Sequence, residues 1–157
     1  MKIFTPKNLY YFNTFEPSIF LAGPTLRDNA KEFTPWREEA LKIFEEKNFK
    51  GRLFIPEPFQ GSYEKQIIWE EYHLGICSCI LFWIPRNMQT LPGLTTNVEF
   101  GDWMKSNKVV LGFPKEAEHM SYLEHKAKKY NISMSNTLVD TISLSIALAK
   151  ASTLDRD

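Results

Sequence analysis

Short, nearly continuous apolar runs recur along the chain, separated by longer segments with a different pattern. The clearest runs occupy residues 18–22, 53–55, 79–84 and 109–113. Apolar runs of this length without polar alternation are typical of strands buried on both faces of a parallel sheet. We therefore predict that these four runs form the core strands of an α/β fold.

Helical periodicity fills the segments between the runs. Thr34 and Pro35 form a helix-start signal, with threonine as the cap and proline in the first turn. Further helices are expected at residues 63–76, 96–106, about 118–130 and 136–150. Strands that alternate with helices indicate βαβ units. The pattern thus predicts a three-layer sandwich, in which a mostly parallel sheet is flanked by helices.

The chain is expected to form one domain. Its 157 residues suffice for one sizeable core, and no repeat, low-complexity tract or linker interrupts them. Residues 1–17 are rich in aromatic side chains and precede the first core run, so we expect an N-terminal arm or hairpin there. No apolar run reaches the roughly 20 residues that a membrane-spanning helix needs.

Composition and charge restrict the partners and the compartment. Lysine plus arginine equals aspartate plus glutamate, which argues against a nucleic-acid polymer as a partner but leaves a nucleoside or nucleotide open. The start of the chain shows no secretory signal pattern, and Cys77 and Cys79 are poorly spaced for a mutual disulfide. Together with His73 they supply too few ligands for a zinc site. A cytoplasmic protein with buried free thiols is expected.

Glu99 is the first candidate for chemistry. It follows a predicted strand and the Gly93 loop, and it falls at the start of a predicted helix, where ligands bind in open α/β sheets. A glutamate held there by backbone amides would stay ionised and could act as a nucleophile or an electrostatic stabiliser. Thr96 and Glu99 also match a capping box, so an ordinary helix cap is the alternative.

Two further features could converge with Glu99. Gly23, Pro24 and Thr25 directly follow the first core run, where glycine lets a ligand approach the backbone and the following amides can hold oxygen-rich groups. Glu70 lies on the helix that leads into the 79–84 strand. The alternatives are an ordinary tight turn for the first feature and a solvated helix face for the second.

Two residues near the end of the 79–84 strand could contact a ligand. Trp83 could stack on a planar base, although an aromatic residue there can equally belong to the core. Arg86 follows closely and is suited to meet an anion.

Several short motifs in a fixed order resemble one known family. They are Ile19–Thr25, Trp36-Arg37, Ile55-Pro56-Glu57, Gln66–Glu70, Ile80–Arg86 and Thr95–Gly101. In this order and spacing they resemble the nucleoside 2-deoxyribosyltransferase family, most closely its deoxyribosyltransferase-like branch. The resemblance covers roughly residues 18–130.

The resemblance implies a flavodoxin-like fold and cleavage of the N-glycosidic bond of 2′-deoxynucleosides, with transfer of the sugar to another base or to water. It makes Glu99 the nucleophile, and Glu70 the acidic residue that assists at the base. It also implies that the segment from Phe20 to Gly23 contacts the nucleoside. The substrate-binding set then comprises Phe20, Gly23, Pro24, Thr25, Trp83, Arg86 and Asn97. Neither a metal nor an organic cofactor is expected.

The chain also departs from the family and leaves alternatives open. Gly93 and Ser78 stand where better-known members tend to have aspartates, and the first departure bears on recognition of the sugar hydroxyls. The alternatives are a hydrolase of a deoxynucleotide or of another N-glycoside, and a non-catalytic nucleotide-binding or sensing domain.

Assembly is a further expectation from the resemblance. Family members form dimers or larger homo-oligomers, in which the C-terminal region of a neighbour closes each site. Leu138, Ile142, Ile146 and Ala149 form an apolar stripe that could pack on the chain's own sheet or on a neighbour. Asn136 could reach a neighbour's sugar.

Overall fold

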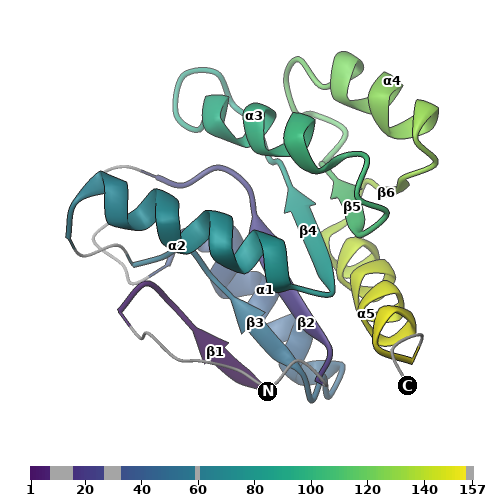
Figure 1. Ribbon diagram of the computed structural model, residues 1–157. Helices are drawn as coiled ribbons and strands as arrows, with labels where there is room; N and C mark the ends of the chain where they lie inside the picture. Colours follow the sequence, from purple (N-terminus) through teal and green to yellow (C-terminus); the bar gives the residue numbers. More distant parts are fainter. Residues whose placement is uncertain (8–15, 27–32, 59–60, 155–157) are drawn as a thin grey trace.

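Within the residues described by the computed structural model, which are 1–7, 16–26, 33–58 and 61–154, one parallel sheet forms the centre of the molecule. Its strand order is β1-β3-β2-β4-β5-β6 (Figure 1). The strands are β1 (Lys2–Phe4), β2 (Ser18–Ala22), β3 (Arg52–Phe54), β4 (Cys79–Trp83), β5 (Val109–Gly112) and β6 (Ser133–Ser135). From β2 onward this is the strand order of flavodoxin-like folds, so the predicted fold class is confirmed.

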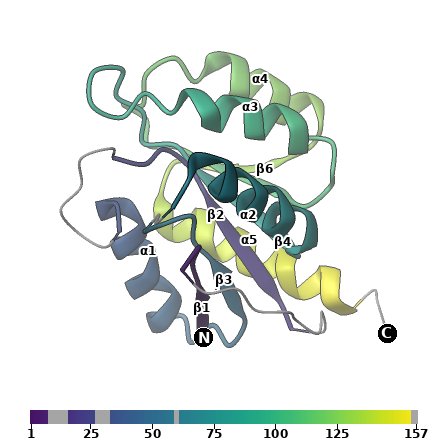
Figure 2. The same ribbon diagram turned by 60° about the vertical axis from the view of Figure 1, so that its left-hand side comes forward.

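Helices cover both faces of the sheet (Figure 1 and Figure 2). On one face lie α1 (Pro35–Glu46) and α5 (Leu138–Leu154), and on the other lie α2 (Tyr63–Ile76), α3 (Leu94–Trp103) and α4 (Ser121–Lys129). Side chains that alternate along each strand feed two separate cores. In β4, Leu81 packs toward α1 and α5, whereas Phe82 packs toward the other three helices.

The predicted elements agree with the structure in their order and mostly in their bounds. The first core strand and the 63–76 helix have the predicted limits. The helix expected at 96–106 instead begins at Leu94, because Gly93 caps it in the left-handed conformation with φ of 60°. The last helix begins at Leu138, and the side chains of Leu138, Ile142 and Ala149 are buried against the chain's own sheet.

Two strands were not predicted. β1 pairs in parallel with β3, so residues 2–4 belong to the sheet rather than to a hairpin or a free arm. Residues 8–15, the rest of that prediction, lie outside the described part. β6 pairs with β5 through Ser133, Met134 and Ser135. Both are short edge strands, and edge strands lack the apolar run that marks a strand buried on two faces.

Both cysteines are buried beside the central strands as free thiols. Burial raises the pKa of Cys77 to about 11 and raises that of Cys79 further. Among the described residues, no cluster of three or more histidine, cysteine or acidic side chains could hold a metal ion. None of the helices in that part of the chain is long and apolar enough to cross a membrane.

Candidate functional site

The carboxyl ends of β2 and β4 meet at the point where the strand order reverses. After β2 the chain continues to β3 on one side, and after β3 it crosses to β4 on the other side. In open α/β sheets, ligands bind in the crevice outside such a switch point. The turn after β2 and the helix after β4 are therefore the places where functional side chains are expected.

Gly23 lets the turn after β2 pack directly on the end of β4. Its φ is 150°, and a Cβ atom there would lie 2.2 Å from the backbone oxygen of Trp83 and 2.9 Å from the Trp36 ring. No other residue fits this position without a backbone shift. Glycine is thus required at this turn by contacts within the protein.

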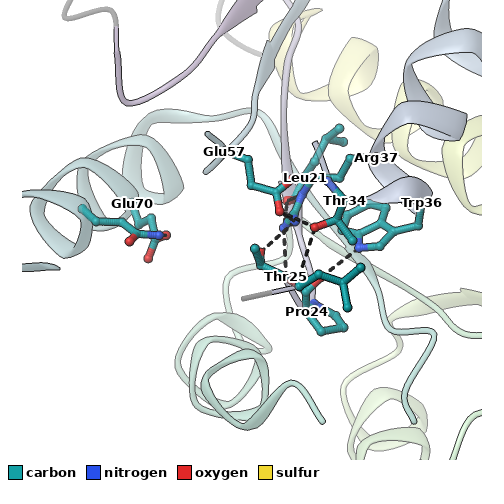
Figure 3. Close-up of polar contacts among 11 residues, drawn as sticks. Leu21, Pro24, Thr25, Thr34, Trp36, Arg37, Glu57 and Glu70 are labelled. Carbon is teal, nitrogen blue, oxygen red and sulfur yellow. Dashed lines mark hydrogen bonds and ion pairs between the residues drawn. The ribbon is translucent and has the colours of Figure 1, made fainter. Parts of the chain in front are cut away.

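A buried ion pair between Arg37 and Glu57 holds the same turn in place (Figure 3). Arg37 is fully buried, and its guanidinium donates to the backbone oxygens of Leu21 and Gly23 at 3.1 and 2.9 Å. It also donates to Thr25 Oγ1 at 2.9 Å and lies 3.1 Å from a carboxylate oxygen of Glu57. One arginine therefore fixes the path of the chain from Leu21 to Thr25.

Glu57 is fixed in turn by the start of α1. Its carboxylate accepts from the backbone N–H of Thr34 at 2.7 Å and from the Thr34 hydroxyl. The Thr34 side chain is therefore bonded to Glu57 and makes no capping bond within its own helix. Arg37, Glu57, Thr34 and Thr25 thus form one hydrogen-bonded group, the Arg37 cluster. It links the turn after β2, the segment after β3 and the start of α1.

Sequence reasoning did not assign a role to Arg37 or Glu57, although both lie in motifs that carry the resemblance. A signal was present for Arg37. It falls three residues before Ala40 and seven before Phe44, on the apolar face of its helix. A charged residue on a core-facing position requires a buried partner, and a carboxylate after the next strand is a suitable one.

Glu70 lies on α2 and is partly buried, unlike its exposed neighbour Glu71. Gln66 Nε2 donates to its carboxylate at 2.8 Å, and Figure 3 shows Glu70 apart from the Arg37 cluster. Burial raises the pKa of Glu70, while the Gln66 hydrogen bond and the positive charge of Arg37 oppose that rise. Glu70 is therefore not on a simply solvated helix face.

Glu99 lies in the second turn of α3, six residues after the Gly93 cap. The alternative of a capping box formed by Thr96 and Glu99 is wrong, because Thr96 is already inside the helix and is buried. Burial raises the pKa of Glu99 to about 7, and the nearby charges of Glu70 and Asp102 add to the rise, while Arg37 opposes it. The expectation that backbone amides keep Glu99 ionised is therefore also wrong, since those amides are free only in the first turn.

Glu70, Glu99 and Arg37 form one electrostatic group. Glu70 raises the pKa of Glu99, and Arg37 lowers the pKa of both carboxyls. Burial is the main cause of the raised pKa of both carboxyls, and the charge of Glu70 adds to it at Glu99, so Glu99 tends to retain a proton near neutral pH. Such a pair can supply one carboxylate and one carboxylic acid, which is the requirement of glycosidic-bond chemistry.

The two aromatic candidates belong to the cores. Phe20 is 1% exposed and packs against Trp69, with ring centroids 6.0 Å apart. Trp83 is 6% exposed and lies in the core beneath α1 and α5. Their rings offer no free face to a nucleoside, because alternation along each strand directs them into the cores rather than over the sheet edge.

The remaining residues that were predicted to bind substrate do not all lie near Glu70 and Glu99. Pro24 lies at the site, where its side chain packs against Gly93 and its backbone oxygen accepts from Trp36 Nε1 at 2.9 Å. Thr25 is exposed beside Arg37. Asn97 and Arg86 are hydrogen bonded to each other. They lie away from Glu99, because residues two apart on a helix point about 200° apart.

Asn136, which was expected to reach the sugar bound by a neighbouring subunit, donates to the backbone oxygen of Phe113 at 3.0 Å within its own chain.

In comparisons with known proteins, the chain matches no protein-family model and no curated sequence.

Proposed function

We propose that the protein cleaves the N-glycosidic bond of a 2′-deoxynucleoside and passes the deoxyribosyl group to another base or to water. The observation that carries this proposal is the coupling of Glu70 and Glu99, which come from different helices on the same face of the sheet. Paired carboxyls of raised pKa are typical of glycosidic-bond chemistry. The resemblance to nucleoside 2-deoxyribosyltransferases supports the same substrate class.

In the proposed reaction, the carboxylate of Glu99 attacks the anomeric carbon on the face opposite the base. The C1′–N bond breaks, and its electron pair leaves with the base, which receives a proton from Glu70 directly or through a water. The negative charge of Glu99 stabilises the oxocarbenium-like transition state. A second base or a water then attacks the glycosyl-enzyme and releases Glu99.

This mechanism predicts a specific pH dependence. Glu99 attacks only when ionised, and its pKa in the free protein is about 7. The active form also needs a protonated Glu70, so it carries one proton on the pair. Because kcat/KM reports the ionisations of the free enzyme, it should rise as the pair loses its first proton and fall as it loses the second, at about pH 7. A kcat/KM that is flat between pH 5 and 8 would contradict the assignment of Glu99 as the nucleophile.

The direct test is a panel of 2′-deoxynucleosides and their 5′-monophosphates, with and without a free acceptor base. Chromatography follows base release and base exchange in the wild-type protein and in Glu99→Gln and Glu70→Gln. Removing the nucleophile should lower turnover by at least about 10³-fold, and removing the proton donor by about 10²-fold or more. Glu71→Gln is the matched control, since Glu71 is the exposed neighbour on α2.

Each outcome has a defined meaning. Exchange that requires the acceptor base establishes a transferase, and base release without it establishes a hydrolase. A preference for the monophosphates identifies a nucleotide as the substrate. Unchanged turnover in Glu99→Gln would refute the nucleophile, and no turnover with any substrate would favour the binding-domain alternative.

We also propose that the protein is a homo-oligomer. Tyr63, Ile68 and Tyr72 of α2 are 65%, 60% and 48% exposed, and Val98 of α3 is 63% exposed. Exposed apolar side chains gathered on adjacent helices are typical of interaction surfaces. Sedimentation should show a dimer or larger assembly in the wild-type protein and dissociation in Ile68→Asp, whereas a monomeric wild type would refute the proposal.

A further inference from the structure

A cavity lies on the opposite side of α3 from Glu99. Its volume is about 530 Å³, which is within the usual range for small-molecule sites. The cavity is lined by residues of α3 and α4, which lie side by side in Figure 1 and Figure 2, and by residues of the loop that follows β4. It is separate from the Glu70–Glu99 pair, because Asn97 and Gly101 line it from the other face of α3.

Arg86 is the unusual feature of this cavity. It is only 5% exposed, and it donates through Nη1 to the backbone oxygen of His119 at 3.2 Å and through Nη2 to Asn97. Its Nε is buried and has no hydrogen-bond partner among the described residues. No described carboxylate forms an ion pair with it. A buried charge without a counter-ion is costly, and an unsatisfied buried donor requires an explanation.

Apart from Asn97, the rest of the lining is mostly basic or apolar. His119 and Lys126 add two further basic side chains, and the lining contains no aspartate or glutamate. Met88, Leu94 and Tyr122 are 41%, 65% and 67% exposed at its edge, and Phe100 is buried within it. A buried positive charge in the wall of a largely apolar cavity complements an amphiphilic anion.

We propose that this cavity binds a small organic anion, in which a carboxylate, sulfonate or phosphate is joined to an apolar or aromatic body. The anionic group would lie against the guanidinium of Arg86 where this residue lines the cavity, and it would supply the missing counter-charge. The apolar body would lie between α3 and α4, against Phe100 and Tyr122. This site is independent of the proposed glycosidic chemistry, since it uses neither Glu70 nor Glu99.

Gly101 offers a way to test the cavity without disturbing the fold. It lines the cavity from within α3, and a Cβ atom built there meets no heavy atom within 4 Å. Gly101→Leu should therefore fill the cavity and favour the helix. Gly75 in α2 is also helical and equally free of contacts, so Gly75→Leu is the matched control.

The probe is anilinonaphthalene sulfonate, a fluorescent aromatic anion, and its neutral counterpart is phenylnaphthylamine. We expect saturable binding of the sulfonate to the wild-type protein and to Gly75→Leu, weakened roughly tenfold or more in Gly101→Leu and in Arg86→Met. Lys126→Met, which alters a side chain at the cavity wall, should weaken it less. Circular dichroism and thermal melting confirm that each variant folds.

Competition distinguishes the sources of the anionic group. Displacement of the probe by benzoate but not by inorganic phosphate indicates a carboxylate ligand, and the reverse indicates a phosphate ligand. Equal binding of the sulfonate and the neutral probe would overturn the proposal. So would the absence of saturable binding, or unchanged affinity in Gly101→Leu.

Discussion

Arg37 illustrates how one buried side chain can fix the backbone conformation beside a candidate site. Its guanidinium is removed from water, and burial lowers its pKa, while Glu57 and the two site carboxyls oppose that change. The charge is tolerated because backbone oxygens and Glu57 replace its hydration. The same contacts that compensate the charge define the turn beside the candidate site.

The Arg37–Glu57 pair should be strongly non-additive. Arg37→Met leaves a buried carboxylate without its counter-ion, and Glu57→Gln leaves a buried guanidinium without its own. Each should lower the free energy of unfolding by about 3–5 kcal/mol, and the double variant should lose much less than the sum. Urea denaturation measures all three. Additive losses would show that the two side chains stabilise the fold independently.

Glu99 should make the stability of the protein depend on pH. Its pKa rises from 4.5 in the unfolded chain to about 7 in the fold, so the folded state binds the proton more tightly. The resulting stabilisation is complete below pH 4.5 and is lost as the pH rises through 7. Relative to wild type, Glu99→Gln should therefore gain on the order of 2–3 kcal/mol between pH 4.5 and 8. A difference between the two proteins that is constant with pH would contradict this expectation.

Among the elements, α3 is decisive because its starting point sets the surroundings of Glu99. The left-handed Gly93 begins the helix three residues earlier than a cap based on Thr96 would allow. That shift moves Glu99 from the first turn, where free amides stabilise a carboxylate, to the second turn, where burial and Glu70 act on it. The position of Gly93 thus changes the protonation state that is expected for Glu99, the candidate nucleophile.

The two site glycines should respond differently to substitution. Gly93→Ala places a Cβ atom 3.0 Å from the Pro24 side chain and a left-handed residue at the cap, which should cost about 1–2 kcal/mol. Gly23→Ala places its Cβ 2.2 Å from a backbone oxygen, which cannot move without displacing β4. Chemical denaturation should show the larger loss for Gly23→Ala, and equal losses would refute this ranking.

For the whole molecule, the position of each strand in the sheet should set its resistance to opening. β4 lies between β2 and β5, and all five of its residues are buried. β1 and β6 are three-residue strands at the two edges. We expect amides of β4 to exchange hydrogen only through global unfolding and those of β1 and β6 to exchange much faster. Equal protection in β1 and β4 would contradict this ordering.

The sequence was sufficient to predict the strands that are buried on both faces, because burial leaves an apolar run such as Cys79–Trp83. It did not reveal β1 or β6, whose pairing depends on long-range neighbours rather than on local pattern. In the site, the helical pattern placed Glu70 and Glu99 on the correct helices, but it put Glu99 at the helix start rather than in the second turn. The protonation of Glu99 could not be predicted, since it depends on burial and on a carboxyl from another helix.

The two buried cysteines should be unreactive toward thiol-specific reagents in the folded protein. Thiolates, not thiols, attack alkylating reagents. Burial raises the pKa of Cys77 to about 11 and raises that of Cys79 further, so both sulfurs stay protonated and enclosed at neutral pH. A single cysteine introduced at an exposed position of the described chain, such as Gly75 or Asp102, would therefore be the fastest site of alkylation. Maleimide dyes or spin labels could then be attached there without first removing the native thiols.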